Sequence, residues 1–422
     1  MLTTSALAAT PVQNCDDSNA PGTLRSSIAT AATGEVIDLS NLPCNGIKLV
    51  GPLTVNVADL TIKGPHGLFT LDGQYTHSRI FQHRGAGTLK LEYIAASSGL
   101  ANDTTGGCID SQGNVQLFHS QLSDCDVAPL RSTPYNTLAE GGAIYAKGSV
   151  TLTASSISGG VVNNSYGVAV GGAIAAAESV ILQSDPLIPG SGSSISYSFT
   201  IGDASIGSSS AGAISSDRVF IEDSTIFSCR ALRAGAVEAA SYLKVVNSTF
   251  SMNTATAGSS AKYGVGAISA SGAIIIESST FANNTGHKYG ALQTGPNAHT
   301  NIDSSIFANS SNPAGQAVPD IGQSANMPGT FGGSNNLIAN PSPGLVGTVS
   351  GPANLTSLGD FGGRTLVHSL MPGSAALRAG SNDFGFTFDQ RGQPRGRGNN
   401  VDIGAVQITD ILFDDGFEPT LR

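Results

Sequence analysis

With 422 residues the chain could hold two or three globular domains, but its composition is unusual for such domains. It has 53 glycines, no tryptophan and only 12% charged residues, which suits tightly stacked strands joined by many turns. The net charge of -10 argues against nucleic acid or an anionic membrane surface as a partner, and no apolar run reaches the length of a transmembrane helix.

The first residues have two interpretations. Ser5–Ala9 resembles the end of a signal peptide, with small residues at a cleavage site, but it is short and lacks a basic segment before it. A disordered leader explains it equally well. In either case we assign residues 1–12 to a leader remnant and expect a secreted or cell-surface protein.

Residues 13–44 are predicted to form an N-terminal cap. Leu24 and Ile28 lie four residues apart on one face of a short helix, which the polar residues 16–19 cap and Gly34 ends. A solenoid needs such a cap, because its first coil otherwise leaves apolar surface open to water.

Residues 45–345 are predicted to form the coils of a β-helix. Short segments with alternating apolar residues are separated by glycine and proline turns, and from Gly107 onward a repeat is visible. Its serines are spaced by 24, 31 and 25 residues, which fits strand–turn coils and leaves no room for helical repeats. The aligned columns are Ser224, Ser248, Ser279 and Ser304; Ile226, Phe250, Phe281 and Ile306; and Cys229, Asn253, Asn284 and Asn309.

The sequence therefore predicts an all-β, single-stranded, right-handed parallel β-helix with a short N-terminal capping helix. Its handedness follows from that of parallel crossover connections. Like residues then stack about 4.8 Å apart in successive coils, with aliphatic and phenylalanine side chains inside and asparagines at a turn. We assign residues 346–408 to C-terminal coils and a cap, and residues 409–422 to a tail that is either a last edge strand or a sorting element.

The five cysteines are expected to form two local disulfides and leave one buried thiol. Cys15 and Cys44 bracket the first unit, and Cys108 and Cys125 bracket one coil. Cys229 shares a column with Cys125, but two coils lie between them, so at least about 10 Å separates them, too far for a disulfide. Disulfides fit an oxidising compartment.

Two insertions interrupt the repeat, at residues 132–136 and 185–194. They belong to nearby coils, so we expect them to project side by side as a ridge of variable loops on a rigid scaffold. Tyr135 in the first loop and Tyr197 just after the second are the candidate binding residues, because aromatic rings stack on sugar rings.

Two parts of the chain resemble known families. The Gly-Gly-Ala steps at 141–143 and 171–173 and the Phe-x-x-Asn steps at 250–253 and 281–284 resemble the repeats of polymorphic outer-membrane proteins, which are surface β-helices and adhesins. The C-terminal stretch resembles the choice-of-anchor domain of bacterial surface β-helix proteins. The residues that carry this second resemblance are 358–365, 368–370, 372–376, 389–392 and 401–405; Leu377-Arg378 departs from the usual apolar-acidic pair.

The resemblance implies adhesion or glycan binding at a cell surface, and the alternative is a polysaccharide lyase or glycoside hydrolase of the pectate-lyase-like class. Such an enzyme needs convergent carboxylates, with a basic residue in a lyase. Glu222 and Glu277 share an outward column with Val246 between them, and Asp223 and Asp303 share the next, which is also what a solvated face looks like. We therefore predict no catalytic residues, metal ligands or cofactor, and a monomer whose partner is a carbohydrate or another cell-surface ligand.

Overall fold

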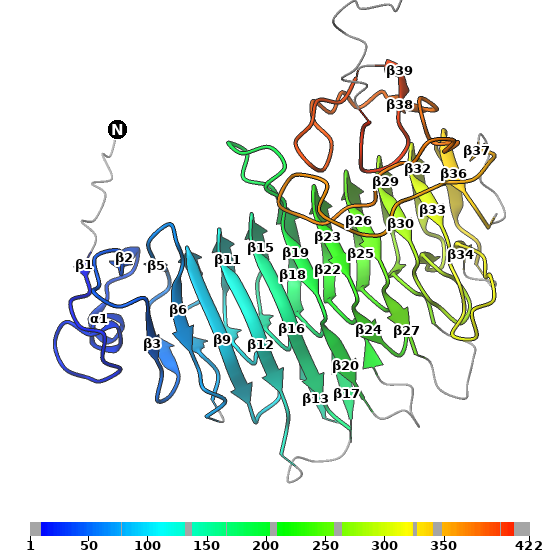
Figure 1. Ribbon diagram of the computed structural model, residues 1–422. Helices are drawn as coiled ribbons and strands as arrows, with labels where there is room; N and C mark the ends of the chain where they lie inside the picture. The colour runs from blue at the N-terminus through cyan, green and yellow to red at the C-terminus, as the bar shows by residue number, and fades with distance from the viewer. Residues whose placement is uncertain are drawn as a thin grey trace, which may run out of the picture.

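The computed structural model describes residues 10–76, 78–130, 137–165, 167–202, 209–256, 264–323, 327–340, 348–396 and 398–408. These residues form a parallel β-helix, an elongated solenoid whose coils follow one another along its axis (Figure 1). Tyr135 and most of the predicted leader and tail lie outside the described residues. The fold class predicted from the repeat is confirmed.

The large sheet has 19 strands and receives two strands from a typical coil. The first strand of each coil lies in one ladder: β4 (Leu53–Val55), β7 (Phe81–His83), β10 (Ile109–Ser111), β14 (Ile144–Ala146), β28 (Ile268–Ala270), β31 (Leu292–Thr294) and β34 (Ile321–Gln323). The next strand lies in a second ladder: β1 (Thr10–Pro11), β2 (Glu35–Asp38), β5 (Leu60–Lys63), β8 (Thr88–Glu92), β11 (Asn114–Phe118), β15 (Val150–Thr153), β29 (Ala273–Glu277), β32 (His299–Asp303) and β35 (Thr330–Gly332).

Three long strands cross both ladders and join them into one sheet. These are β18 (Ile174–Gln183), β22 (Ile214–Glu222) and β25 (Val237–Val246). The register shifts between Ala176 and Ser179 on β18, and again between Ser216 and Arg218 on β22. Such irregularities bend a strand, so three consecutive coils carry one continuous outer surface that changes direction at its middle.

The second sheet has 15 strands and closes the solenoid on its other side. Its main ladder contains β3 (Gly46–Lys48), β6 (Phe69–Asp72), β9 (Ile94–Ala101), β12 (Gln121–Val127), β16 (Ser156–Asn163), β19 (Ser194–Ser196), β23 (Thr225–Phe227), β26 (Thr249–Ser251), β30 (Thr280–Ala282), β33 (Ile306–Ala308), β36 (Asn336–Ile338) and β37 (Thr348–Val349). It continues beside this ladder in β20 (Phe199–Ile201), β24 (Arg230–Ala231) and β27 (Thr254–Ala255), and a short sheet lies nearby, with β13 (Leu138–Glu140), β17 (Val168–Val170) and β21 (Ser209–Ser210).

A buried ladder of serines runs along the turn between the large and second sheets. The residue before a ladder serine often has a positive φ, as Asn247 does at 44°, which turns the chain and leaves the serine's N–H inside the solenoid. The Oγ of the serine one coil further accepts that N–H, as between Ser224 and Ser248 at 3.1 Å, so the buried donor is satisfied. The members are Ser120, Ser155, Ser193, Ser224, Ser248, Ser279 and Ser305.

The fourth repeat starts one residue later than the sequence alignment placed it. Ser305, not Ser304, continues the ladder, and Phe307, not Ile306, pairs with Phe281. Thr285 pairs with Ser311, so Ser310, not Asn309, follows Asn284 in the asparagine column. The alignment was wrong because Ser304 and Ser305 each have an apolar residue two positions later. The spacing between repeats varies, so it is compatible with either serine in the column.

The predicted interior columns are otherwise confirmed. Phe250, Phe281 and Phe307 are fully buried and their rings stack in parallel, with centroids 4.9 Å and 4.7 Å apart. Asn253 accepts the N–H of Cys229 at 3.1 Å and donates to Asn284 at 3.1 Å, which satisfies the buried amides from coil to coil.

The N-terminal cap contains helix α1 (Leu24–Thr30), with Leu24 and Ile28 buried as expected. Thr23 is its N-cap, instead of the polar residues 16–19, and accepts the N–H of Ser26. The predicted disulfides Cys15–Cys44 and Cys108–Cys125 are both present, and Cys229 is a buried free thiol. Local cross-links of this kind hold the first coils closed.

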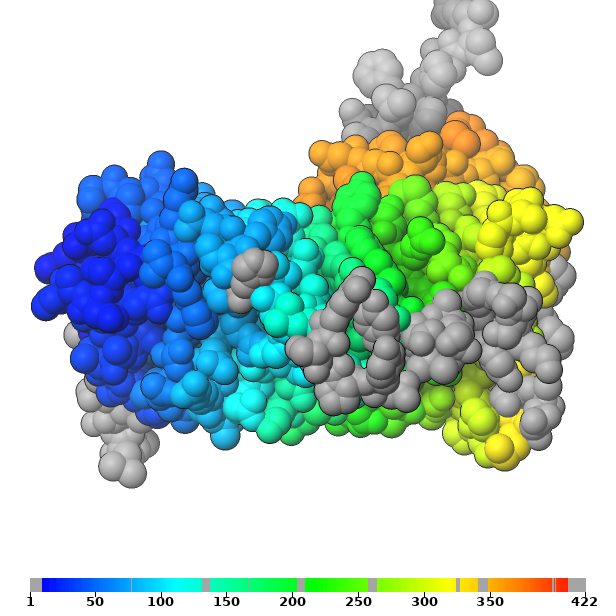
Figure 2. Space-filling view, turned by 90° about the horizontal axis from the view of Figure 1, so that it is seen from below, coloured from blue at the N-terminus to red at the C-terminus, as the bar shows by residue number. Residues whose placement is uncertain are grey.

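The C-terminal segment, residues 350–408, leaves the solenoid and runs back along the outer face of the second sheet. In the space-filling view it lies over the green and yellow coils and leaves the blue and cyan coils uncovered (Figure 2). Its contacts include a hydrogen bond from Thr249 to Gln390 of 2.6 Å and one between Ser251 and His368 of 2.9 Å. Strands β38 (Gly380–Asn382) and β39 (Gly398–Val401) form its small antiparallel sheet.

Candidate functional site

The structure describes one of the two insertions that were expected to form a ridge. Residues 185–194 connect β18 to β19, and the last of them begins β19. Residues 132–136 lie outside the described residues, so the ridge stays a prediction.

Of the two predicted binding residues, the structure describes Tyr197. Its side chain is 58% exposed and meets Phe227 edge to face, with ring centroids 5.4 Å apart. The pair lies at the second sheet, and Tyr197 remains a prediction as a ligand contact.

The carboxylates of the large sheet do not form the two separate columns that were expected. Glu222 and Glu277 share a column with Val246 between them, as predicted. Asp303 belongs to that same column, one coil beyond Glu277, and not to the column of Asp223, because of the one-residue offset in the fourth repeat. Glu277 lies in the wall of the sheet and is only 5% exposed. Burial raises its pKa, the charge of nearby Lys244 opposes the rise, and the charge of Asp303 adds to it.

Two half-buried aromatic rings lie side by side on the outer surface of the long strands. Phe220 of β22 and Tyr242 of β25 have ring centroids 5.1 Å apart and planes inclined by 35°. They line a hollow of about 410 Å³ together with Ile181 and Lys244. We call Phe220, Tyr242, Ile181 and Lys244 the aromatic platform.

The charges around the aromatic platform are mixed. The guanidinium of exposed Arg218 lies 5.4 Å from the Phe220 ring centroid and 5.7 Å from that of Tyr242, which is within cation–π range. Lys244 and Glu222 line the same hollow. The platform thus offers flat apolar rings beside hydrogen-bond donors and one acceptor, held on neighbouring strands whose backbones are fixed by the sheet.

A second hollow, of about 440 Å³, lies where the long strands bend. Its floor consists of small residues from three coils: Ala175, Ala176, Ala177, Ser215, Ser216, Ala239 and Ala240. Its ionisable lining residues are Glu140, Tyr145, Asp217 and Glu238, none of them basic. We call this hollow the acidic groove.

The state of its acids follows from their surroundings. Burial raises the pKa of Glu140, and burial together with the charges of Glu140 and Asp110 raises the pKa of Tyr145. Glu238 accepts a hydrogen bond from Ser210. Ser210 lies two strand pairings from Glu140 in the short sheet, about 9.6 Å along the axis.

No protein-family model, curated protein or solved structure matches this chain. Within the described ranges, no helix is long and apolar enough to cross a bilayer, and no group of three or more potential ligands is placed to hold a metal ion. The candidate sites are therefore interpreted from their own geometry.

The aromatic platform could have been found in the sequence. Phe220 stands between the inward residues Val219 and Ile221, and Tyr242 precedes inward Leu243, so alternation places both rings outside in consecutive repeats. The bulge in the register, which puts Arg218 opposite Tyr242, had no sequence signal.

Proposed function

We propose that this protein is a secreted or cell-surface β-helix scaffold that binds a carbohydrate on the aromatic platform without cleaving it. The observation that carries the proposal is the side-by-side pair of Phe220 and Tyr242 in a hollow on a rigid sheet. Sugar rings present apolar C–H faces that pack on aromatic rings, while their hydroxyl groups need donors and acceptors at the rim. Arg218, Lys244 and Glu222 supply those groups.

The location outside the cell is part of this proposal. Two disulfides are compatible with an oxidising compartment. The resemblance of the C-terminal segment to choice-of-anchor domains, and of the repeats to polymorphic outer-membrane proteins, supports display at a bacterial surface.

The proposal is tested with purified protein and a panel of neutral, N-acetylated and acidic oligosaccharides, each assayed for binding and for cleavage. The double variant Phe220→Ala/Tyr242→Ala should lose at least about fivefold in affinity, because each stacked ring contributes about 0.5–1.5 kcal/mol. Tyr75→Ala, which removes an aromatic ring that is 44% exposed, is the matched control. Unchanged affinity in the double variant would reject the platform, and loss in Tyr197→Ala alone would move the site to the second sheet.

The acidic groove favours a second candidate, a glycoside hydrolase, over a lyase. Burial raises the pKa of Glu140, as it does for the general acid of a hydrolase, and Glu238 is a second acidic residue that lines the groove. Among the residues that the structure describes, no lysine or arginine lines the groove to act as the base of a lyase. Release of reducing ends from any oligosaccharide by the parent, and its loss in Glu140→Gln, would establish this candidate.

A further inference from the structure

A cleft adjoins the aromatic platform where three separate parts of the chain meet. We call it the junction cleft, and its volume is about 190 Å³. The loop after β18 contributes one side, the edge of the large sheet the floor, and the C-terminal segment the opposite wall. The lining residues are Ser184, Asp185, Pro186, Pro189, Gly190, Glu222, Asp223, Asn247, Phe386, Thr387 and Phe388. Glu222 lines both the platform hollow and this cleft, so the two adjoin at this residue.

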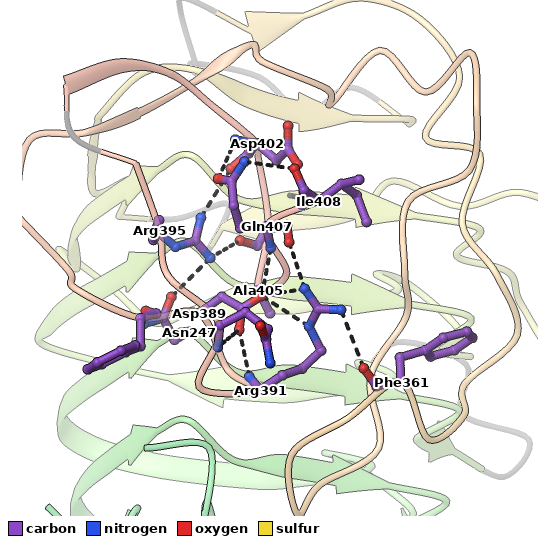
Figure 3. A network of polar contacts seen from close by, with 12 residues as sticks. Asn247, Phe361, Asp389, Arg391, Arg395, Asp402, Ala405, Gln407 and Ile408 are labelled. Carbon is purple, nitrogen blue, oxygen red and sulfur yellow. Dashed lines mark hydrogen bonds and ion pairs between the residues drawn. The ribbon is translucent and has the colours of Figure 1, made fainter. Parts of the chain in front are cut away.

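The C-terminal wall of the junction cleft is held in place by buried polar contacts. The side chain of Asn247 donates to the carbonyl of Phe388 at 3.0 Å and accepts from Arg395 at 3.2 Å. The next residue, Asp389, is buried and pairs with Arg391 at 2.7 Å, while it also accepts the N–H of Gln407 at 2.8 Å (Figure 3). These contacts fix the backbone at Phe388 and at the residue after it, so Phe388 presents its 39% exposed ring at a defined position.

Asp223 is the acid of the junction cleft, and its surroundings favour the protonated form. Its carboxyl group accepts a hydrogen bond from Ser184 at 2.9 Å. Burial raises its pKa to about 7, and the charges of Glu222 and Asp389 add to the rise. A carboxyl group in this state donates a hydrogen bond that a carboxylate cannot donate.

The other charged groups around Asp223 come from all three parts of the chain. The loop carries Asp185, which is paired with His119 at 2.9 Å and whose pKa is lowered by that hydrogen bond. The sheet edge carries Glu222. The C-terminal segment carries the Asp389–Arg391 pair, and Arg395 behind Asn247. The groups that line the cleft itself, Asp185 and Glu222, are acidic, so an anionic sugar would be repelled.

We propose that the junction cleft is a second subsite that holds one uncharged sugar ring at the end of the glycan on the aromatic platform, with the protonated Asp223 as donor and Phe388 as stacking face. This subsite rests on the proposed function. Its volume is below the 300–1,000 Å³ of pockets for drug-sized ligands, so it suits a single ring and not a chain. The ligand class is therefore a neutral or N-acetylated oligosaccharide, with a terminal residue that carries no carboxylate.

Affinity should then depend on pH in a defined direction. Below the pKa of Asp223 the donor is present, and as pH rises through about 7 it is lost and a third negative charge faces the sugar. Loss of one hydrogen bond corresponds to a fall in affinity of up to about tenfold.

The test is isothermal titration of the full chain at pH 5.5, 7.0 and 8.5, with hexasaccharides of glucose, N-acetylglucosamine and galacturonic acid. Asp223 has a φ of 51°, which asparagine tolerates well, so Asp223→Asn keeps the turn and carries an amide donor at every pH. We expect one of the two uncharged hexasaccharides to bind the parent with an affinity that falls about tenfold from pH 5.5 to 8.5, and Asp223→Asn to bind it equally at all three. Phe388→Ala, a change at an exposed ring, should weaken binding at every pH. It is the second test of the subsite if Asp223→Asn does not fold.

The outcomes separate the subsite from the platform. A flat pH profile in the parent, an unchanged slope in Asp223→Asn, or tightest binding of the galacturonate probe rejects the subsite. If Phe220→Ala/Tyr242→Ala still abolishes binding in those cases, the proposed function stands alone. If no hexasaccharide binds the parent, both are rejected.

Discussion

Replacing Phe281 with alanine removes the middle ring of the buried phenylalanine stack. Phe281 is fully buried and has a parallel ring on each face, 4.9 Å from Phe250 and 4.7 Å from Phe307. Replacing a buried phenylalanine by alanine lowers the free energy of unfolding by about 3–5 kcal/mol, because apolar burial is lost and a cavity remains. Since close packing on both faces resists collapse of the cavity, we expect about 4–5 kcal/mol for Phe281→Ala. Phe250→Ala, which loses a ring contact on one face only, should cost less, about 3–4 kcal/mol.

The measurement is urea unfolding followed by circular dichroism, with hydrogen exchange of β26, β30 and β33 as a local probe, because coils of a solenoid unfold partly on their own. The matched control is Phe227→Ala, a half-buried ring on β23 one residue beyond the column. The control should lose no more than about 1.5 kcal/mol. A loss below about 1 kcal/mol for Phe281→Ala, or equal protection of β30 in both variants, would show that the stack does not support these coils.

Three further outcomes follow from buried groups. Cys229 has a pKa raised to about 12 by burial, so iodoacetamide at pH 8 should modify it in 8 M urea only; modification of the native protein would mean that its coil opens. Asn253→Ala leaves the buried N–H of Cys229 without an acceptor, and should lower the free energy of unfolding by about 1–3 kcal/mol while Asn45→Ala, at an exposed position, changes it little. The folded pKa of Asp223, about 7, exceeds its unfolded value of about 3.9, so stability should fall as pH rises from about 4 to about 7, by up to about 4 kcal/mol; a parent and an Asp223→Asn variant with parallel pH–stability curves would refute this.

The coils could be predicted because their determinants are local and repeated. Alternation placed Leu243 and Val245 inside, and the cysteine spacing gave both disulfides, since stacking distance excluded the bond from Cys229 to Cys125. The same local reasoning fails where two neighbouring residues fit the repeat equally well, as Ser304 and Ser305 do. There, only the pairing of whole coils decides the register.

The position of the C-terminal segment had no local signal. Its anchoring bonds join residues more than a hundred positions apart, such as Thr249 to Gln390 and Asn247 to Phe388. The ion pair between Asp389 and Arg391 joins residues two positions apart, but it fixes the wall of the junction cleft on the side of the solenoid. For the same reason the cleft itself, which needs three distant segments, could not be read from the sequence.

The lateral course of the C-terminal segment also has a mechanical consequence. A solenoid whose coils contact only their neighbours yields one coil at a time when its end is pulled. Here Gln390 bonds Thr225 and Thr249, and Ala405 bonds Thr280, so a splint joins successive coils from the side. Force applied at the C-terminus would first peel the C-terminal segment from the second sheet, bond by bond, before it reached any strand of the solenoid. A protein built in this way would extend under load in two stages, with the uncovered early coils and their disulfides as the last part to give way.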